Sequence, residues 1–587
     1  MTTDFQYYWD RYFKPREHEG PDKRMPLGEA VGRFVTPGAV LHMSRHAQAA
    51  MNEVVRQFYG TRPDFTFVLG TAEQNVFHLV GAGLVKRVIT GNLSNINPSP
   101  SPSRLLGRLT RQGEIEMENW SLFTLMQRLM AGALGLEFMP TRSLAGSTIA
   151  EELPDAYAMI DSPFSDERWG MVKALRPDIS VIHAVVADRA GNAIPTSGDG
   201  EAVWAARASK GGVIVTTERV VSTSVINDHA GLVRVPAYMV KAVCEVPHGA
   251  HPQSLSSPLE GVSSYAEDVE FSVAQRRATD DPDQIDAWLK EWVLDCTDQE
   301  AYLAKLGRPR LTRLLRAASD ESWRQEIEES FRGERVGNPS WSATEMMVVA
   351  AARRIEAAAL KNGYRVLLAG VGTGGLATYL AYYRLRDQGH EVEVAIGSGP
   401  LGHLPRLAVI DTWQHWPHAK LAGDALDNYG SFLRGSDSQA MGVLGAAMID
   451  KHGNINSTRL PNGTFLIGSG GANDVAAGAR EALVAANHTP QRLVESVGYI
   501  TVPGERVKTL VTDRGIMEKD DSGEFVLMSV FPGEGSLAER IKAAIDQCGW
   551  ELRIAPDVTE EPPPMQEELT LARLLDVRGQ FLPERGG

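Results

Sequence analysis

The sequence predicts an α/β protein made of two tandem, related open α/β domains whose sheets are largely parallel. Apolar runs without polar alternation, such as "VIHAVVAD" (181–188) and "RVLLAG" (365–370), are typical of strands buried on both faces. Segments with helical spacing separate these runs, as in "TEMMVVAAARRIEAAAL" (344–360). A D-x-x-G-N turn follows an apolar run in each half, as "DRAGN" (188–192) and "DKHGN" (450–454), which indicates an internal duplication.

Length and charge limit the classes of function. A chain of 587 residues is too long for one hydrophobic core, so several domains are expected. The net charge of -15, without a long run of like charge, argues against a nucleic-acid partner. We recognise no secretory signal and no apolar stretch of roughly 18 residues, so the sequence predicts a cytoplasmic protein without a membrane partner.

The cysteines and histidines predict no metal site. Cys244, Cys296 and Cys548 are far apart and match no metal-binding spacing, which favours ordinary thiols in a reducing compartment. The histidine pairs in "EVPHGAHPQSL" (245–255) and "WQHWPHAK" (413–420) are interleaved with proline and lack the helical spacing of a zinc protease. No Gly-x-Ser-x-Gly nucleophile elbow is found either.

The elements are expected in the following order along the chain. An N-terminal extension precedes a first α/β domain, and a charged, helix-prone linker leads to a second α/β domain. The expected limits are 1–30, 31–280, 281–340 and 341–587. Strands are expected at 65–70, 87–90, 181–188, 211–218, 365–370 and 392–397.

Three glycine-rich loops in the second half carry the clearest chemical signal. They lie in "LLAGVGTGGLATYLAYYRL" (367–385), "EVEVAIGSGPLGHLP" (391–405) and "FLIGSGGANDVAAGAREALVAAN" (465–487), each after an expected strand. In the first and third, a helix is expected to follow, at Ala472 in the third. Exposed backbone N–H groups beside a helix N-terminus suit a phosphate or an oxyanion. The spacing of "GSGGAN" is neither a dinucleotide fingerprint nor a P-loop, so we expect a phosphate-bearing or acyl-thioester ligand.

Three polar residues of the first half are further candidates. Glu118 stands just before a helix in "ENWSLFTL", where an acid is most often a cap or a partner of the helix dipole. Catalysis is the alternative interpretation. Arg142 and Ser143 lie in "FMPTRSLAGST", a loop that either suits an anionic group or is an ordinary polar connection.

The order of these motifs resembles the class I CoA-transferase family, with its α-type and β-type parts fused in one chain. The α-type resemblance covers roughly 30–280 and includes "ENWSLFTLMQRLMAGALGLEFMPTRSLAGS" and "VVADRAGN". The β-type resemblance covers roughly 340–580 and includes "GVGTGG", "GSGGANDVA" and "YITVPGERVKTLVTD". The family implies two similar open α/β domains, an active site at their interface and acyl-CoA substrates.

The sequence departs from the family at the catalytic glutamate of the β-type half. In the transferases this residue ends the strand after the "GVGTGG"-like turn and carries CoA covalently. The same position here is Gly397. Glu391 and Glu393 lie at the beginning of the strand, and a rise of about 3.3 Å per residue places Glu393 some 13 Å away.

One branch of the family is similar in this respect. Its members, CoA-thioester hydrolases that open a ring in bacterial steroid degradation, lack the β-type glutamate and use a glutamate of the α-type half. "Glu118-Asn119-Trp120-Ser121" resembles that context, which implies that Glu118 is a general base. The resemblance further implies acyl binding by Arg142 and Ser143.

The glycine loops are assigned on the same basis. The oxyanion would be stabilised by backbone N–H groups of Gly468, Gly470, Gly471 and Ala472. The residues expected at CoA are Gly372, Gly374, Gly375, Gly397, Gly399, Gly468 and Asn473. Coenzyme A is expected as part of the substrate, with no tightly bound cofactor and no metal.

Three functions follow as alternatives. The first is an enzyme that uses Glu118 for hydrolytic or retro-Claisen C–C cleavage, or a related enolate step, on an acyl-CoA. The second is a CoA-transferase in which another carboxylate takes the place of the missing one. The third is a non-catalytic protein that binds acyl-CoA. For the assembly, the family suggests a homodimer of fused chains.

Overall fold

A computed structural model describes residues 4–14, 18–73, 76–95, 101–397, 399–406, 413–434 and 439–582. The first half of the chain forms an open sheet in which all neighbours along the path are parallel, with one short antiparallel strand, β9 (Ala193–Pro195), beside β8. Its order is β11 (Val240–Glu245), β10 (Val213–Val221), β8 (Ile179–Asp188), β1 (Val40–Met43), β2 (Phe65–Ala72), β3 (Val85–Leu93) and β4 (Glu116–Asn119).

The second half forms a larger sheet with a parallel centre. Strands β13, β12, β16, β19 and β21 are parallel, and antiparallel strands extend the sheet on both sides. Its order is β15 (Leu421–Ala422), β14 (Pro400–Leu401), β13 (Glu393–Ile396), β12 (Val366–Ala369), β16 (Ala440–Gly445), β19 (Glu481–Ala486), β21 (Val507–Thr512), β22 (Gly515–Lys519), β23 (Phe525–Val530) and β24 (Arg553–Glu560). The predicted fold class, two tandem α/β domains with largely parallel sheets, is confirmed.

The duplication is visible in two matching turns. Asp188 ends β8, and its Oδ2 accepts a hydrogen bond of 2.8 Å from the side chain of Asn192. Asp450 ends β17 (Met448–Asp450), and its Oδ2 accepts one of 3.0 Å from the side chain of Asn454. In both turns Oδ1 also accepts the asparagine backbone N–H. The sequence echo therefore reflects the same local structure in both halves.

Two smaller sheets lie outside these main sheets. One contains β5 (Phe138–Thr141), β7 (Arg168–Lys173) and β6 (Tyr157–Asp161), and the other contains β18 (Ile455–Asn456), β17 and β20 (Leu493–Val494). Short 3-10 or π-helical segments occur at Trp9–Phe13, Ala230–Leu232, Ala237–Met239, Lys290–Leu294, Trp413–His415, Asp427–Phe432 and Gly504–Arg506.

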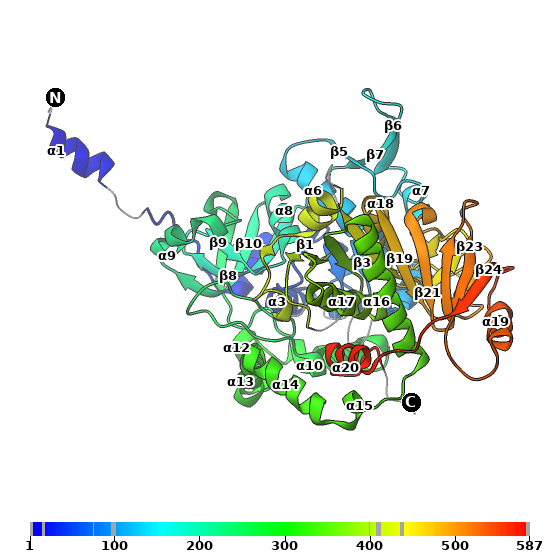
Figure 1. The fold of residues 1–587 in the computed structure, drawn as a ribbon. Helices are drawn as coiled ribbons and strands as arrows, with labels where there is room; N and C mark the ends of the chain where they lie inside the picture. The colour runs from blue at the N-terminus through cyan, green and yellow to red at the C-terminus, as the bar shows by residue number, and fades with distance from the viewer. Residues whose placement is uncertain are drawn as a thin grey trace.

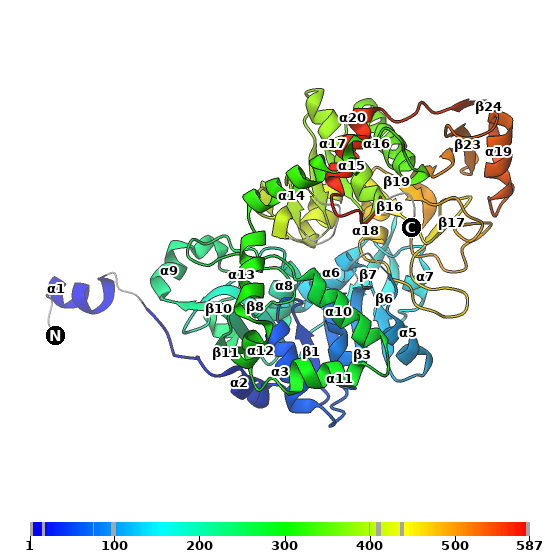
Figure 2. The ribbon, with the colours of Figure 1, turned by 90° about the horizontal axis from the view of Figure 1, so that it is seen from below.

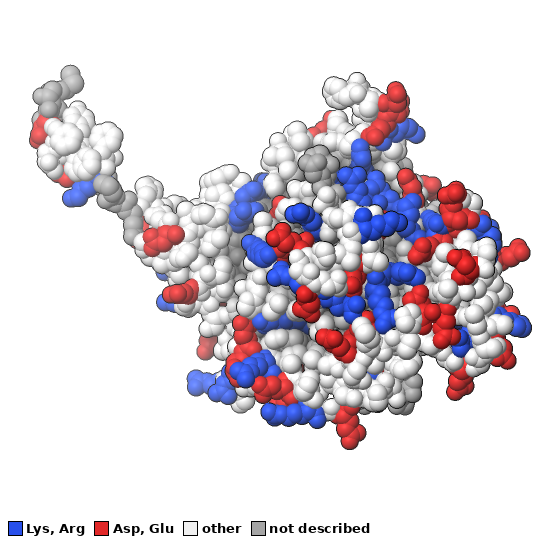
Figure 3. Space-filling view, in the orientation of Figure 1, with Lys and Arg blue, Asp and Glu red and all other residues white. Residues whose placement is uncertain are grey.

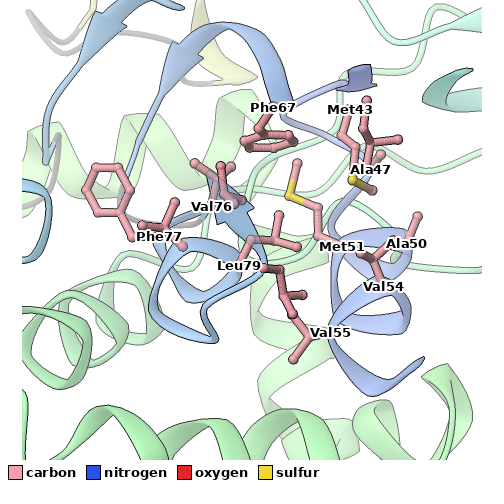
Figure 4. Close-up of a cluster of buried hydrophobic side chains, with 14 of the residues drawn as sticks. Met43, Ala47, Ala50, Met51, Val54, Val55, Phe67, Val76, Phe77 and Leu79 are labelled. Carbon is pink, nitrogen blue, oxygen red and sulfur yellow. The ribbon is translucent and has the colours of Figure 1, made fainter. Parts of the chain in front are cut away.

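The helices of the first half pack around its sheet, with the exception of α1, which stands apart in Figures 1 and 2. They are α1 (Phe5–Tyr8), α2 (Leu27–Phe34), α3 (Gln48–Phe58), α4 (Phe77–Gly81), α5 (Arg104–Arg111), α6 (Leu122–Ala133), α7 (Thr148–Glu151), α8 (Gly200–Ala208) and α9 (Thr223–Asp228). Figure 4 shows Met51 and Val55 of α3 on the side of Phe67 and Leu79, in one hydrophobic core that also includes Val54. Apolar spacing in α3 therefore serves packing against the sheet.

The linker helices divide between the two halves. They are α10 (Val269–Asp280), α11 (Ile285–Leu289), α12 (Gln299–Leu306), α13 (Arg308–Ala317), α14 (Asp320–Arg332) and α15 (Glu334–Gly337). Ile285 and Leu289 of α11 belong to the first core, whereas α15 packs against α20 (Gln566–Leu575) of the second half. Figure 2 shows α13 over the first half and α15 beside the second.

The second half carries its own helices. They are α16 (Ala343–Asn362), α17 (Thr373–Asp387), α18 (Ala472–Gly478), α19 (Leu537–Asp546) and α20. Helices α16 and α17 pack against each other, and their alanine-rich faces form a second hydrophobic core. Ser342 and Glu345 form a capping box that fixes where α16 begins.

The expected domain limits remain a prediction, but packing refines them at the N-terminal side. The N–H of Met25 donates to the carbonyl of Val243 on β11, and the N–H of Val243 donates to the carbonyl of Lys23. The chain therefore joins the first half before residue 31. In Figure 3, Lys and Arg side chains lie among Asp and Glu on the face shown, which accords with the absence of a long like-charge run.

Candidate active site

A cavity of about 600 Å³ lies between the two halves at the carboxyl ends of parallel strands from both main sheets. The first half contributes Gly70 and Asn92, near the carboxyl ends of β2 and β3. The second half contributes Ala369, the last residue of β12, and Gly397 after β13. Open α/β sheets bind ligands at such strand ends, so this cavity is the candidate active site.

The "GSGGAN" loop forms part of this cavity and also bridges the halves. The N–H of Gly470 donates to the carbonyl of Gly91 in the first half at 2.8 Å, and the N–H of Leu122 donates back to Gly470 at 3.0 Å. The N–H of Leu93 donates to Ile467 at 2.9 Å. The expected strand before this loop is therefore wrong, because the segment pairs across the interface instead of joining a sheet of its own half.

Asp474, at the start of α18, holds the two halves together. Its Oδ1 accepts hydrogen bonds of 2.6 Å from the hydroxyls of Ser121 and Ser143, and its Oδ2 accepts the N–H of Phe123 at 3.1 Å. Burial raises the pKa of Asp474, although Arg434 and the two hydroxyls oppose the shift. Ser143, predicted at the acyl group, is therefore part of the interface and does not line the cavity.

Asn473 has a similar structural role. Its Oδ1 accepts the N–H of Leu144 from the first half at 2.7 Å, and its Nδ2 donates to the carbonyl of Thr501 at 2.8 Å. The side chain is almost fully buried and does not line the cavity. In this structure the predicted CoA ligand thus uses its amide to join the halves.

The predicted oxyanion donors divide into two groups. Gly468, Gly470, Gly471 and Ala472 all line the cavity. However, the N–H groups of Gly468, Gly470 and Ala472 donate to the carbonyls of Ser457, Gly91 and Ser469. These three amides are therefore structural donors and not the predicted oxyanion donors, because each is already bonded to protein. The role of Gly471 stays a prediction.

Gly397 lines the cavity and faces the hydroxyl of Tyr429. A Cβ atom at Gly397 would lie 1.7 Å from that oxygen, and a Cβ atom at Gly471 would lie 1.8 Å from it. Tyr429 is itself a lining residue and sits in the π-helical turn Asp427–Phe432. The phenol thus takes up the space beside two glycines, and neither position can hold a side chain without moving it.

The remaining glycines predicted at CoA lie outside the cavity wall. Gly372, Gly374 and Gly375 begin α17, with Gly372 as its N-cap at a φ of 84° that favours glycine. Gly399 has a φ of 136° and packs against the carbonyl of Gly423. None of the four lines the cavity, and their contact with CoA stays a prediction.

Glu118 lies at the end of β4, buried, and does not line the cavity. Its Oε1 accepts hydrogen bonds from Trp120 Nε1 at 2.7 Å and Arg128 Nη1 at 2.6 Å, and Arg87 binds Oε2. Burial opposes the charge, but Arg128, Trp120 and Arg87 outweigh it and hold the pKa of Glu118 below its ordinary value. This environment suits a buried ion pair better than a base that must take up a proton.

Arg142 is half exposed and bonds to Glu167 at 2.8 Å, with its guanidinium over the ring of Trp169. It lies beside the small sheet of β5, β6 and β7, and is not a lining residue. Arg142 and Ser143 are adjacent in sequence but have different environments. The structure therefore does not bring either of them to the cavity.

Two acids that the sequence interpretation missed do line the cavity. Asp199 is the N-cap residue of α8, and Glu201 lies in the first turn of that helix. Arg45 of the first half lies on the same wall. The run "GDGE" (198–201) was the available signal, since it places two acids at a glycine-flanked helix start.

His251, from the first of the two predicted histidine pairs, has both ring nitrogens in contact with the protein. His251, fully buried, contacts the hydroxyl of Tyr302 at 2.7 Å and Asp268 at 3.0 Å. Among the described residues no group of three metal-binding side chains was found. In the same part of the chain, no helix has the length and apolar character needed to span a bilayer.

Comparisons of the sequence with known proteins match it to coenzyme A transferases. The sequence model of the family described as Coenzyme A transferase matches residues 24–246. One subunit of 3-oxoadipate CoA-transferase from Pseudomonas knackmussii is 31% identical over 48% of this chain and 98% of its own length. A second subunit of the same enzyme is 31% identical over 41% of this chain and 95% of its own length.

Two further matches define the range of relatives. The cholesterol ring-cleaving hydrolase IpdA subunit of Rhodococcus jostii is 28% identical over 46% of this chain and 89% of its own length. An acyl-CoA transferase structure from Escherichia coli O157:H7 has a TM-score of 0.64 at 16% identity and covers 96% of this chain and 98% of its own. The latter supports the tandem fold alone.

Proposed function

Since the chain belongs to the coenzyme A transferase family and is one of its enzymes, we propose that it acts on an acyl-CoA thioester in the cavity between its halves. The proposed reaction is hydrolytic, including retro-Claisen C–C cleavage of a 3-oxoacyl-CoA. Coenzyme A enters as part of the substrate. The similarity to a cholesterol ring-cleaving hydrolase supports this class of reaction.

One observation favours hydrolysis over CoA transfer. The loop after β13 offers Gly397 to the cavity, and the hydroxyl of Tyr429 occupies the space where a side chain at that position would begin. No carboxylate can therefore act from this position in the described arrangement. Covalent transfer of CoA needs such a nucleophile, whereas hydrolysis needs a base and a bound water.

The cavity offers suitable groups for this chemistry. Its apolar wall includes Leu122, Met126 and Val443, which suits an acyl chain. Gly471 precedes α18, and we propose that its backbone N–H stabilises the oxyanion or enolate. Tyr429 on the same wall supplies a hydroxyl that can donate to the same oxygen.

Isotope labelling tests the proposal. The purified full chain is incubated with acetyl-CoA, acetoacetyl-CoA, succinyl-CoA and a cyclic 3-oxoacyl-CoA in heavy-oxygen water, and the products are identified by mass spectrometry. Hydrolysis incorporates label into the released acid or the opened ring. Binding of these esters without turnover would contradict the proposal and leave a non-catalytic acyl-CoA-binding protein.

CoA transfer is the second candidate function, because two subunits of a CoA-transferase are each 31% identical to this chain. Transfer predicts a covalent intermediate on a carboxylate. Incubation with an acyl-CoA followed by borohydride or hydroxylamine, and then peptide mass spectrometry, detects that adduct. An adduct together with unlabelled products favours transfer over hydrolysis.

A further inference from the structure

Two acidic residues among those described line the cavity, and only one of them is placed to act as a base. Within the described part of the chain, Asp199 and Glu201 are the only acids among the lining residues. They stand at the N-terminus of α8 in the first half of the chain. Their environments differ, and that difference decides which of them can react.

The carboxylate of Asp199 is held by contacts within the protein. It is buried, and its Oδ2 accepts a hydrogen bond of 2.6 Å from the hydroxyl of Ser44, with His46 Nδ1 at 3.4 Å. Burial opposes its charge, but His46, Ser44 and Arg45 outweigh burial and hold its pKa below the ordinary value. Asp199 therefore serves as a fixed anion at the helix start.

Glu201 is anchored through one oxygen only. Its Oε1 lies 3.2 Å from Nε2 of His42, and Nδ1 of His42 lies 2.6 Å from the hydroxyl of Ser180. His42 and Ser180 are fully buried. Each contact has one donor and one acceptor if the Ser180 hydroxyl donates to Nδ1 of His42 and the Nε2–H of His42 donates to Glu201. This histidine then orients the carboxylate and keeps it an acceptor.

The second oxygen, Oε2, faces Gly70. A Cβ atom at Gly70 would lie only 2.3 Å from it, so the carboxylate holds this position because residue 70 has no side chain. Among the described residues no group donates a hydrogen bond to Oε2. Both Glu201 and Gly70 line the cavity, and the Glu201 side chain keeps 19% of its surface exposed.

We propose that Glu201 is the general base of the hydrolysis and that His42 is its positioning residue. The assignment rests on the proposed function. In the step, Oε2 of Glu201 takes a proton from water while the water oxygen bonds to the carbonyl carbon. The C–C or C–S bond of that carbon then breaks, its electron pair leaves on carbon or sulfur, and Glu201 returns the proton to that atom.

Substitutions of Glu201 test the assignment. Glu201→Gln and Glu201→Ala should lower kcat by about 10²- to 10⁴-fold, the range for loss of a general base. The affinity for coenzyme A, measured by calorimetry, should stay at the wild-type value. Formate should restore part of the activity of Glu201→Ala, because a small carboxylate can enter the space that the side chain leaves. A structural role would not give this rescue.

Two further variants separate positioning from folding. Gly70→Ala pushes the flexible end of Glu201 away from His42, and His42→Asn removes the orienting contact. Both should lower kcat more than they raise KM, with thermal unfolding close to wild type for Gly70→Ala. Glu116→Gln, an exposed acid on β4, is the matched control and should leave kcat unchanged.

Distinct results overturn the two proposals. If the wild-type chain turns over none of the CoA esters, the proposed function and this assignment both fail. If the wild type is active and Glu201→Gln keeps its kcat, or formate rescue is absent in a folded Glu201→Ala, only the assignment to Glu201 fails. A CoA thioester found on Glu201 would make it a nucleophile and would also overturn its role as base.

Discussion

At the scale of single residues, buried ion pairs and cavity-facing acids must be distinguished. Glu118 has both oxygens bound by cations or an indole N–H, whereas Glu201 has one oxygen fixed and one beside a glycine. A base must gain and lose a proton during each turnover. The surroundings of Glu118 resist that change, because protonation would leave Arg128 buried without a counter-charge.

Glu118→Gln provides the first prediction. Removal of one partner from a buried pair should lower the free energy of unfolding by about 3 kcal/mol, measured by chemical denaturation. Glu118→Gln/Arg128→Met should recover much of the loss, because the orphaned cation is removed as well. If activity returns in the double variant, Glu118 has a structural role and not a catalytic one. Activity that stays absent in a stable double variant would support the predicted base.

The same carboxylate gives a pH prediction. The folded-state pKa of Glu118 lies below its unfolded value of about 4.3–4.5, so its stabilising contribution is present above that range. As the pH falls through the folded-state pKa, the contribution is lost. Unfolding midpoints of wild type and Glu118→Gln, measured from pH 6 to about 3, should therefore converge at the acidic end. A constant difference would contradict the expected shift.

Gly397→Ala tests the contact with Tyr429. The new methyl group would lie within 2 Å of the phenol oxygen, and overpacking of this kind costs about 1–3 kcal/mol. Gly397→Ala/Tyr429→Leu should recover part of the stability in denaturant melts. Gly498→Ala is the control, since no atom lies within 4 Å of its Cβ position. Equal effects of the two single variants would disprove the contact.

At the scale of elements, the sequence predicts the positions of strands and loops along the chain better than their hydrogen-bond partners. The glycine loops could be predicted because glycines interrupt the apolar runs locally. The loops at Gly397 and Gly470 do line the cavity. The partners of their amides could not be predicted, because Gly470 donates to Gly91, a residue of the other half. Glu201 was missed since an acid in a first helical turn is common.

Asp474→Ala tests the contact between α18 and the first half. The change leaves the hydroxyls of Ser121 and Ser143 and the N–H of Phe123 without their acceptor, and each unsatisfied donor costs about 1–3 kcal/mol. Hydrogen exchange should rise at 119–125 and 466–476, while the strands of both main sheets stay protected. Asp546→Ala, an exposed residue of α19, should change neither segment.

At the scale of the whole molecule, two packed halves meet at a shared cavity. Contacts at Gly470, Asn473 and Asp474 join the halves without covalent bonds. Helices α2 to α13 pack with the first half, and α15 packs with the second. The natural division of the chain therefore falls between α13 and α14, at Ala318 and Ser319.

Division of the chain tests this conclusion. Fragments 1–318 and 319–587, produced together, should copurify and regain CoA-ester turnover, because the interface contacts remain available. Asp474→Ala in the second fragment should weaken copurification. Fragments that fold separately but never associate would show that the covalent link is needed to form the site.

The short connection between α13 and α14 also determines how the activity of the protein responds to dilution. Two residues separate these helices, so the halves stay at a high effective concentration whatever the protein concentration. An enzyme of two separate chains loses its shared site when diluted below the dissociation constant of the pair. The fused chain should keep a constant specific activity over the same range.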